Sequence, residues 1–343
     1  MTRYRLSLCL SIGALVVVGL LLVLAQHTLN PYVVRILNLC AIYTILGASL
    51  CLLFGFTGQF SLGHAGFMAV GAYTAALLTM TPTQKVKTFI IVDIQPFLLD
   101  LQAPFLVAVL AGGLVAALAG LLVGAPVLRL RGDYLAIATL GFAEIIRIVG
   151  NNTVSITNGA LGLKGIPEHT SLYWSWGFVA VTLFCIRRLV TSSHGRAFQA
   201  VRENEMAAET IGINLFHHKL LSFVISSFFA GVGGALLACL ITTIDPKTFI
   251  FLLTFNVLIV VVAGGQQSLT GCTLAAIGYT VLLEVLRPLE QPWSLGSLEV
   301  PAIPGLRMVL FSLVLLVVII FFRKGLLGGR EFSWRPLLGR WYG

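Results

Sequence analysis

The sequence predicts an all-α, polytopic integral membrane helix bundle of about ten transmembrane spans, with both termini in the cytoplasm. Its 343 residues are 58% hydrophobic and only 10% charged, whereas a soluble domain carries ~25% charged residues to keep its surface hydrated. Apolar runs of roughly 20 residues, enough to cross ~30 Å of hydrocarbon, recur along the chain. This composition argues against a soluble enzyme, a secreted module and a disordered protein.

Ten apolar runs define the candidate spans, of which the eighth is short. They lie near residues 7–25, 32–54, 63–80, 104–128, 134–150, 172–190, 219–243, 250–263, 271–287 and 305–322. Because no polar stretch between them is long enough for a soluble domain, residues 1–343 are expected to form a single transmembrane domain. The motifs Gly71-x-x-x-Ala75 and Gly120-x-x-x-Gly124 are typical of close helix packing in a membrane.

The basic residues orient these spans. With the N-terminus inside, the cytoplasmic segments hold most of the 22 Lys and Arg, including the clusters at 187–219 and 323–340. This bias follows the positive-inside rule. The net charge of +9 therefore indicates orientation in a bilayer and contact with lipid, and no nucleic-acid partner is expected.

Two connecting segments depart from the pattern. Residues 86–101 are apolar but are interrupted by Asp93, Pro96 and Asp100, which predicts an interfacial or re-entrant piece outside. Residues 191–218 form the longest polar segment, which is expected in the cytoplasm. The six cysteines lie inside apolar runs or at their ends, so they are interpreted as small buried residues and not as a disulfide framework.

Catalytic motifs are absent from the sequence. It contains no GxxxxGK[ST], HExxH, CxxC or GxSxG pattern, and no histidine is spaced with a second metal ligand inside a span. We therefore expect neither enzyme activity nor a metal or cofactor bound by this chain.

The polar segment 195–219 shows helical periodicity. Ala197, Val201, Ala208 and Ile211 recur at spacings of three, four and seven residues, and Gly212 is suited to end the helix. A face of small residues on a cytoplasmic helix leaves room for another surface to dock. The alternative interpretation is a solvated connector.

An internal echo links the two halves of the chain. Gly58-Gln59-Phe60-Ser61-Leu62 matches Gly265-Gln266-Gln267-Ser268-Leu269, and both stretches follow an apolar run at a predicted cytoplasmic turn. Glycine-interrupted segments at matching places in two halves are typical of a transport pathway. Chance similarity among glycine-rich helices is the alternative. His64, beside the first turn, is interpreted as forming a hydrogen bond between helices or as part of a gate.

Two charge pairs occur in the outer halves of predicted spans. Glu144 and Arg147 are three residues apart, as are Glu284 and Arg287, so each pair shares a helix face. Charges inside a membrane are costly unless they pair or face water, and an Arg with a Glu complements the two charges of an amino acid. Either these residues line the pathway, or each pair fastens helices together.

Several segments in order resemble the LivM-type permeases of branched-chain amino acid ATP-binding-cassette (ABC) importers. They are GQFSLGHAGFMAVGAYTAALL (58–78), LRLRGDYLAIATLGFAEIIRIV (128–149), GRAFQAVRENEMAAETIGIN (195–214) and FRKGLLG (322–328). Residues 207–212 resemble the EAA loop of ABC importers, although Met206 stands where the family has an acidic residue. The turn Gly264-Gly265-Gln266-Gln267-Ser268 replaces the family's GGLGS-like turn.

This resemblance implies the biological role. It implies a permease subunit in the cell inner membrane that moves leucine, isoleucine and valine by alternating access. The implied partners are a LivH-like second permease, an extracytoplasmic binding protein and two ATPase subunits that hydrolyse ATP. It also implies a coupling loop at 192–218, with contacts from Gly195, Arg196, Glu203, Glu205, Ala207, Ala208, Glu209 and Gly212. The alternatives are a urea or amide ABC permease and an ion-coupled secondary transporter that uses Glu144 and Glu284.

Overall fold

The computed structural model describes residues 19, 22–89, 92–130, 132–290, 293–295, 298–300, 305–321, 325–329 and 331. The long helices are α2 (Pro31–Leu50), α3 (His64–Thr79), α6 (Phe105–Val127), α7 (Asp133–Asn152), α9 (Leu172–Val190), α12 (Leu215–Ile241), α13 (Phe251–Gly264), α14 (Leu269–Val285) and α15 (Leu306–Phe321). These helices coincide with nine of the ten predicted spans. The first predicted span, 7–25, lies mostly outside the described residues.

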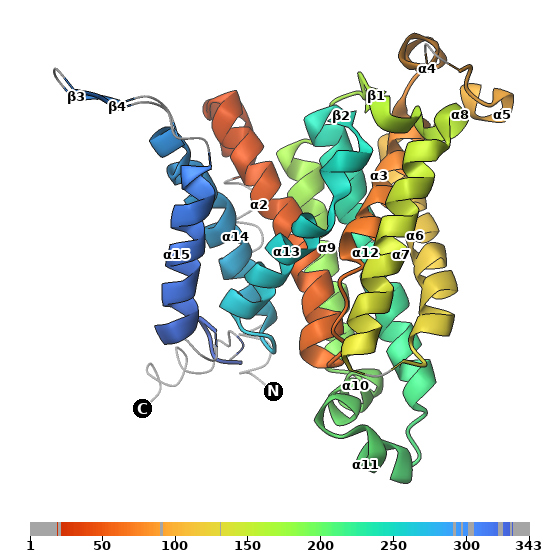
Figure 1. The fold of residues 1–343 in the computed structure, drawn as a ribbon, viewed down its shortest axis with the longest axis vertical. Helices are drawn as coiled ribbons and strands as arrows, with labels where there is room; N and C mark the ends of the chain where they lie inside the picture. The colour runs from red at the N-terminus through yellow and green to blue at the C-terminus, as the bar shows by residue number, and fades with distance from the viewer. Residues whose placement is uncertain are drawn as a thin grey trace.

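The short elements gather at the two ends of the bundle (Figure 1). The upper end carries α4 (Pro82–Thr88), α5 (Pro96–Leu99), α8 (Val154–Thr157) and two antiparallel ribbons. One ribbon pairs β1 (Leu163–Lys164) with β2 (Thr243–Ile244), and the other pairs β3 (Trp293–Leu295) with β4 (Leu298–Val300). The lower end carries α10 (Ser193–Glu203) and α11 (Glu205–Thr210). The segments expected outside the membrane therefore share one end, and the coupling loop lies at the other.

Length and composition separate the helices into two groups. Among the described residues, four segments are long and apolar enough to cross a membrane alone: Pro31–Phe56, Phe105–Val127, Leu215–Ile241 and Leu269–Glu290. The helices α3, α13 and α15 have 16, 14 and 16 residues. A helix rises ~1.5 Å per residue, so these three are shorter than a full hydrocarbon crossing.

Helix α2 ends in a six-residue π-helix, Cys51–Phe56. Its start is set by Asn30, whose side chain accepts from the Tyr32 amide, and by Pro31 in the first turn. π-Helical turns, such as the one at Cys51–Phe56, occur frequently at functional sites. Here the turn leads directly into the Gly58–Leu62 stretch of the internal echo.

The core is formed by α3, α6 and α12, which pack through glycines. A Cβ at Gly71 would lie 2.2 Å from the carbonyl oxygen of Gly231, and one at Gly112 would lie 2.7 Å from the carbonyl oxygen of Gly71. A Cβ at Gly120 would lie 2.5 Å from the Ser227 hydroxyl. The prediction that the Gly71 and Gly120 motifs serve helix packing is confirmed, because only residues without side chains allow such close approach.

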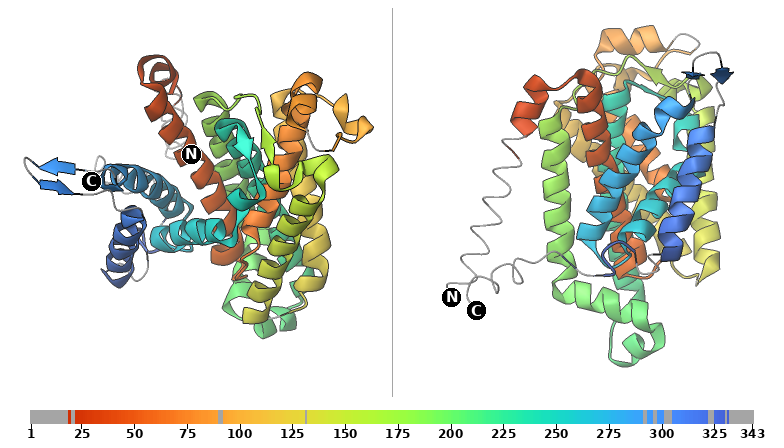
Figure 2. Two further views of the ribbon diagram at one scale, coloured as in Figure 1. Left: turned by 45° about the horizontal axis from the view of Figure 1, so that its top comes forward. Right: turned by 90° about the vertical axis from the view of Figure 1, so that its left-hand side faces the viewer.

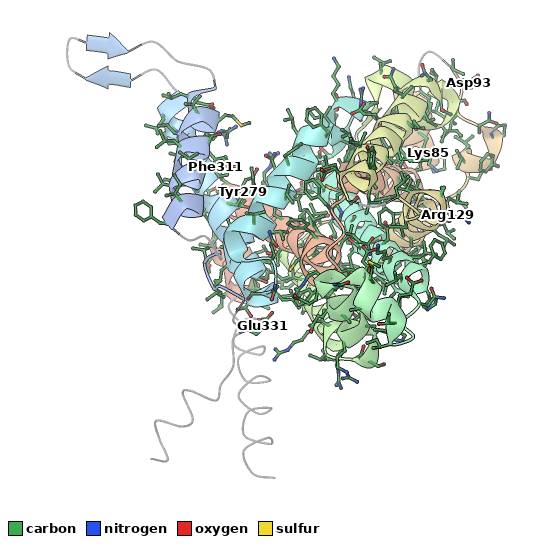
Figure 3. The ribbon with its side chains drawn as sticks, turned by 60° about the horizontal axis from the view of Figure 1, so that its bottom comes forward. Lys85, Asp93, Arg129, Tyr279, Phe311 and Glu331 are labelled. Atoms are coloured by element: carbon green, nitrogen blue, oxygen red, sulfur yellow. The ribbon has the colours of Figure 1, made fainter. Side chains whose placement is uncertain are left out.

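Figure 2 shows how the C-terminal helices are placed. The helices α14 and α15 form a wing on one side of α2, while α6 and α7 lie on the other side of the bundle. The wing is joined to the bundle at α2: a Cβ at Gly47 would lie 3.0 Å from the Cys272 sulfur and from Val260. Tyr279 of α14 and Phe311 of α15 stack edge to face within the wing, with ring centroids 5.2 Å apart (Figure 3).

Candidate functional site

The polar segment predicted to form one coupling helix folds as two helices, α10 and α11. The chain breaks at Asn204, whose backbone is extended and whose side chain accepts from the Ala207 amide to begin α11. Gly212 ends α11 with a φ of +85°, as expected of a glycine after a helix. The prediction of one continuous amphipathic helix is therefore wrong, because an asparagine cap interrupts it.

The break redistributes the predicted face of small residues. Ala197, Val201 and Ala208 are buried inside the chain itself, so they do not form an open docking surface. Exposed apolar side chains are instead Met206 and Ile211, each 74% exposed at the lower end. The other predicted residues divide in the same way: Gly195 is buried and Glu205 is half-buried, whereas Arg196, Glu203, Ala207, Glu209 and Gly212 are exposed.

Two contacts hold α10 and α11 on the bundle. A Cβ at Gly195 would lie 2.0 Å from the Val190 carbonyl oxygen, so the α9–α10 corner requires glycine. Glu205 forms an ion pair of 2.5 Å with Lys219 of α12. Glu205 therefore has a structural partner in addition to any docking role.

Arg202 connects α10 to both copies of the internal echo. Its guanidinium donates to the Gly55 carbonyl oxygen at 2.9 Å, and its nitrogens lie 3.1 and 3.3 Å from the side-chain amide of Gln267. Its stem packs on Gly58, where a Cβ would lie 2.7 Å away. The sequence assigned Arg202 no site role, because its partners are distant in the chain.

The two echo turns share a backbone feature. Gly58 has a φ of +73° and Gly265 has a φ of +104°, each just after a helical segment. Ser268 accepts from the Gly271 amide at 2.9 Å to begin α14, and Ser61 accepts from the Gly63 amide at 3.3 Å. The two turns share a glycine with positive φ but differ at the serine: Ser268 is the N-cap of α14, whereas Gly63 is the N-cap of α3. The π-helix that precedes the first turn touches the second turn, since the Cys51 thiol donates to the Gln266 carbonyl oxygen at 3.2 Å.

Buried hydrogen bonds link α2, α3 and α12 near the first turn. His64 lies 2.9 Å from the Ser49 hydroxyl, and the Ser49 carbonyl oxygen accepts from Ser226 at 2.8 Å. Gln59 donates to the Ser222 hydroxyl at 2.9 Å, while its own oxygen has no partner among the described residues. Both side chains are buried, so their contacts match the interpretation as bonds between helices.

Both Glu and Arg pairs form ion pairs, but they are not brought together. Glu144 and Arg147 of α7 are 2.7 Å apart, and Glu284 and Arg287 are 2.8 Å apart. The Tyr32 hydroxyl also donates to Glu284. The helices α7 and α14 lie on opposite sides of α2 (Figures 1 and 2), so one chain does not combine the two pairs into a single site.

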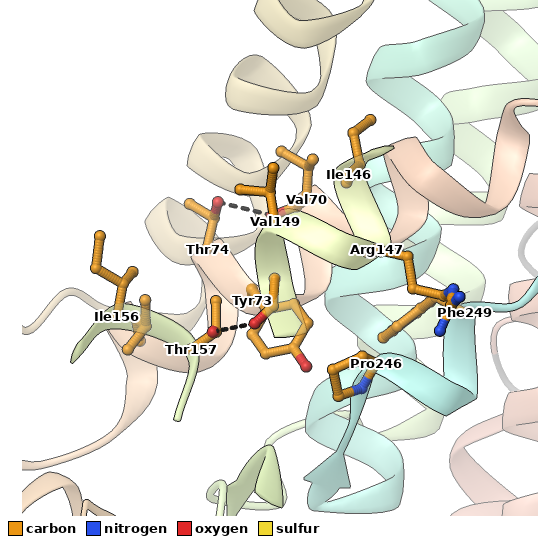
Figure 4. A pocket seen from close by; sticks show the side chains of 13 residues that line it. Val70, Tyr73, Thr74, Ile146, Arg147, Val149, Ile156, Thr157, Pro246 and Phe249 are labelled. Atoms are coloured by element: carbon orange, nitrogen blue, oxygen red, sulfur yellow. Dashed lines mark hydrogen bonds between the residues drawn. The ribbon is translucent and has the colours of Figure 1, made fainter. Parts of the chain in front are cut away.

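A cavity of about 220 Å³ borders the first of these pairs (Figure 4). It lies between α3, α7, α8 and the short helix Pro246–Phe249, and most of its lining is apolar. Its polar side chains are Arg147, Tyr73, Thr74 and Thr157, of which the two threonine hydroxyls already donate to backbone carbonyl oxygens. The sequence did not single out Tyr73, since a tyrosine in a small-residue helix is more often a packing residue.

This architecture of apolar helices, buried hydrogen bonds and a polar helical pair at one end is compatible with a membrane permease. The family model described as "Branched-chain amino acid transport system / permease component" matches residues 32–322, and the chain belongs to this family. It is accordingly a multi-pass protein of the cell inner membrane.

Known relatives agree with this family. The chain is 35% identical over 301 residues to the high-affinity branched-chain amino acid transport system permease protein LivM of Escherichia coli K12, and 36% identical over 301 residues to that of Salmonella typhimurium LT2. Each comparison covers 75% of this chain and 64% of the relative. A probable LivM of Methanocaldococcus jannaschii is 24% identical over 225 residues, covering 62% of this chain and 65% of the relative. The chain thus spans under two thirds of these relatives' length. No solved structure matches it.

Proposed function

We propose that the chain is the permease subunit of an ABC importer that moves branched-chain amino acids across the cytoplasmic membrane. The observation that carries this proposal is the family match over residues 32–322, and the relatives named as branched-chain permeases supply the substrate class. The chain acts as a conduit and does not hydrolyse ATP itself. Two separate ATPase subunits, a second LivH-like permease and an extracytoplasmic binding protein complete the importer.

The coupling contact is assigned to α10 and α11. These helices project beyond the lower end of the bundle (Figure 1), and Met206 and Ile211 present apolar side chains there. Exposed apolar groups rimmed by charges such as Arg196 and Glu209 are typical of a docking site for another protein. Residues 192–218 therefore form the loop that contacts an ATPase subunit.

Movement of this loop reaches the pathway through Arg202. The residue joins α10 to the π-helical end of α2 at Gly55 and to the turn before α14 at Gln267. The two echo turns, with Gln59, Ser61, Gln266 and Ser268, would then shift together when the ATPases close. Two packed arrangements of these turns would give the inward-open and outward-open states of alternating access.

The full span count and orientation belong to the same proposal. Ten spans with both ends in the cytoplasm place α10 and α11 inside and α4, α5, α8 and the two ribbons outside. The outer elements are where a loaded binding protein would dock. Short helices such as α13 are covered in this arrangement by neighbouring helices and by the second permease.

The test is reconstitution of the importer in liposomes. The chain, its second permease and both ATPases should accumulate leucine when ATP is inside and loaded binding protein is outside. The chain alone, with a proton or sodium gradient, should accumulate none. Accumulation by the isolated chain would instead establish an ion-coupled transporter, and uptake of urea but not leucine would overturn the substrate class.

A further inference from the structure

The cavity beside Arg147 has the size and the chemistry of a small-ligand site. Its volume is about 220 Å³, whereas pockets for drug-sized ligands measure ~300–1,000 Å³. It lies in the upper half of the bundle, next to the outer elements α8 and β2 (Figure 4). A small molecule that enters from the outer end would reach this cavity before it reaches the echo turns.

Arg147 offers an unused end of its guanidinium to this cavity. The Nε atom donates to Glu144 at 2.7 Å, and the two terminal nitrogens have no partner among the described residues. Those nitrogens form the planar fork that binds a carboxylate through two hydrogen bonds. Glu144 does not line the cavity, but its ion pair holds Arg147 in place beside it.

The Arg147–Glu144 ion pair is suited to a wet surface and not to lipid. The side chains of Arg147 and Glu144 are 32% and 33% exposed, although they lie within a membrane helix. Charged groups at such depth normally face a bundle interior or a water-filled cavity. This side of α7 is therefore expected to line the pathway that the chain forms with its partner permease.

Tyr73 adds a second polar contact from α3. The residue is only 9% exposed, and its hydroxyl has no hydrogen-bond partner among the described residues. A buried hydroxyl without a partner costs free energy, which a ligand that accepts its hydrogen bond would recover. The ring of Tyr73 meets Phe249 with centroids 6.3 Å apart, so the hydroxyl is held in place at the cavity wall.

The rest of the lining selects the ligand's side chain. Leu77, Ile146, Ile156 and Phe249 present hydrocarbon to the cavity. A charged or strongly polar ligand side chain would lose its water there without a compensating partner. An aliphatic side chain would bury its surface favourably.

From these contacts we propose that this cavity is a transient binding site for a zwitterionic amino acid with an aliphatic side chain. Arg147, held by Glu144, binds its carboxylate together with the Tyr73 hydroxyl, and the apolar wall covers its side chain. The proposal deepens the transport function and rests on it. It adds a selective step within the permease, after release from the binding protein.

Gly150 allows a direct steric test. It lines the cavity, and a Cβ there would meet nothing within 4 Å, so Gly150→Leu fills the space without a backbone clash. Gly141 of the same helix has the same open surroundings but does not line the cavity, which makes Gly141→Leu the matched control. Both variants are assembled in the reconstituted importer with leucine as the probe.

We expect Gly150→Leu to lower ATP-driven leucine uptake at least tenfold, with Gly141→Leu near wild type. Tyr73→Phe should raise the KM for leucine delivery about threefold to tenfold, because one hydrogen bond to a charged ligand is lost. Uptake by Gly150→Leu equal to that of Gly141→Leu would overturn the site while the wild-type importer still transports. Failure of the wild-type complex to take up leucine would instead overturn the proposed function.

A second measurement covers the case in which Gly150→Leu assembles poorly. A cysteine at Thr74, which also lines the cavity, is labelled with a small thiol reagent in the assembled importer. Leucine should slow this labelling several-fold, whereas aspartate should not. Equal labelling rates with and without leucine would overturn the proposal.

Discussion

Lys85 of α4 donates its three ammonium hydrogens to backbone carbonyl oxygens at the end of α5. The acceptors are Leu98 at 2.6 Å, Leu99 at 3.3 Å and Leu101 at 2.7 Å. The side chain is fully buried in the outer segment (Figure 3). Burial lowers the pKa of the Lys85 ammonium, while Asp100 opposes this shift. One lysine thus fixes the shape of a segment assigned to binding-protein docking.

Replacing Lys85 with methionine should destabilise the outer segment. Three carbonyl groups would lose their donor, at a cost of about 1–3 kcal/mol, and thermal unfolding of the purified chain should occur at lower temperature. The difference in stability between wild type and Lys85→Met should widen as pH rises. The unfolded chain holds the Lys85 proton more tightly than the folded chain does, so wild-type stability grows with pH. Lys87→Met, on the exposed side of the same helix, is the control. A gap that narrows with rising pH would contradict the role of burial.

Arg202 is the residue whose loss should uncouple the importer most selectively. Arg202→Gln removes the charged hydrogen bond to Gly55, worth about 1.5–3 kcal/mol, but leaves the exposed surface of α11 unchanged. We expect ATP hydrolysis to persist while leucine uptake falls about tenfold in the reconstituted complex. Arg129→Gln, an exposed arginine just after α6, controls for the loss of charge. Parallel loss of hydrolysis and uptake in Arg202→Gln would contradict a transmitting role.

The sequence predicts residue contacts only when the partners are close along the chain. The Glu144–Arg147 and Glu284–Arg287 pairs follow from helical spacing, because residues three apart share a face. Arg202 and Gly55 are 147 positions apart, and no periodicity connects them. The free hydroxyl of Tyr73 is equally invisible in the sequence, since it depends on what α7 and α8 place around it.

At the scale of elements, the prediction that an ATPase subunit docks on this chain can be tested at α11. Ile211→Asp puts a charge on an apolar side chain that is 74% exposed, so it should not disturb the fold of this chain. It should abolish co-purification of the ATPase subunits while the permease still inserts in the membrane. Ser193→Asp introduces the same charge at the start of α10, where a helix N-terminus tolerates it. Normal ATPase binding by Ile211→Asp would remove α11 from the interface.

A bulky substitution in the glycine interface of α3 should, in contrast, disrupt the fold of the chain. Gly71→Leu places a side chain 2.2 Å from the backbone of Gly231, so α3 and α12 must separate and the core opens. We expect loss of folded protein in the membrane, and not merely of transport. Gly177→Leu on α9, where a Cβ meets nothing within 4 Å, should express normally. Folded, monodisperse Gly71→Leu protein would show that α3 and α12 can shift apart without unfolding.

Helices can be predicted from the sequence where hydrophobicity alone determines them. An apolar run in a membrane must be helical, because its backbone groups find no water to bond. That constraint explains why nine predicted spans coincide with helices. It does not act on the polar segment, where the Asn204 side chain competes for the backbone and divides the predicted coupling helix.

At the scale of the whole molecule, the two ends of the helix bundle differ in their charged residues and in their short elements. The basic cluster at 187–219 lies at the end that carries α10 and α11, whereas the short helices and ribbons lie at the other end. This separation follows from the sequence, since the basic clusters alternate with the spans. The position of the α14–α15 wing on one side of α2 does not follow from it, because it depends on interfaces such as Gly47 against Cys272.

The orientation of the molecule is tested by labelling two engineered cysteines. In a chain whose six cysteines are replaced by alanine, Ser193→Cys lies at the start of α10 and Thr83→Cys lies on α4, both exposed. A membrane-impermeant thiol reagent added to intact cells should label Thr83→Cys and spare Ser193→Cys. Inverted membrane vesicles should give the reverse pattern, because the positive-inside rule holds the basic end in the cytoplasm. Labelling of Ser193→Cys from outside would place α10 and α11 beyond the reach of any cytoplasmic ATPase, and ATP-driven transport could not then operate through them.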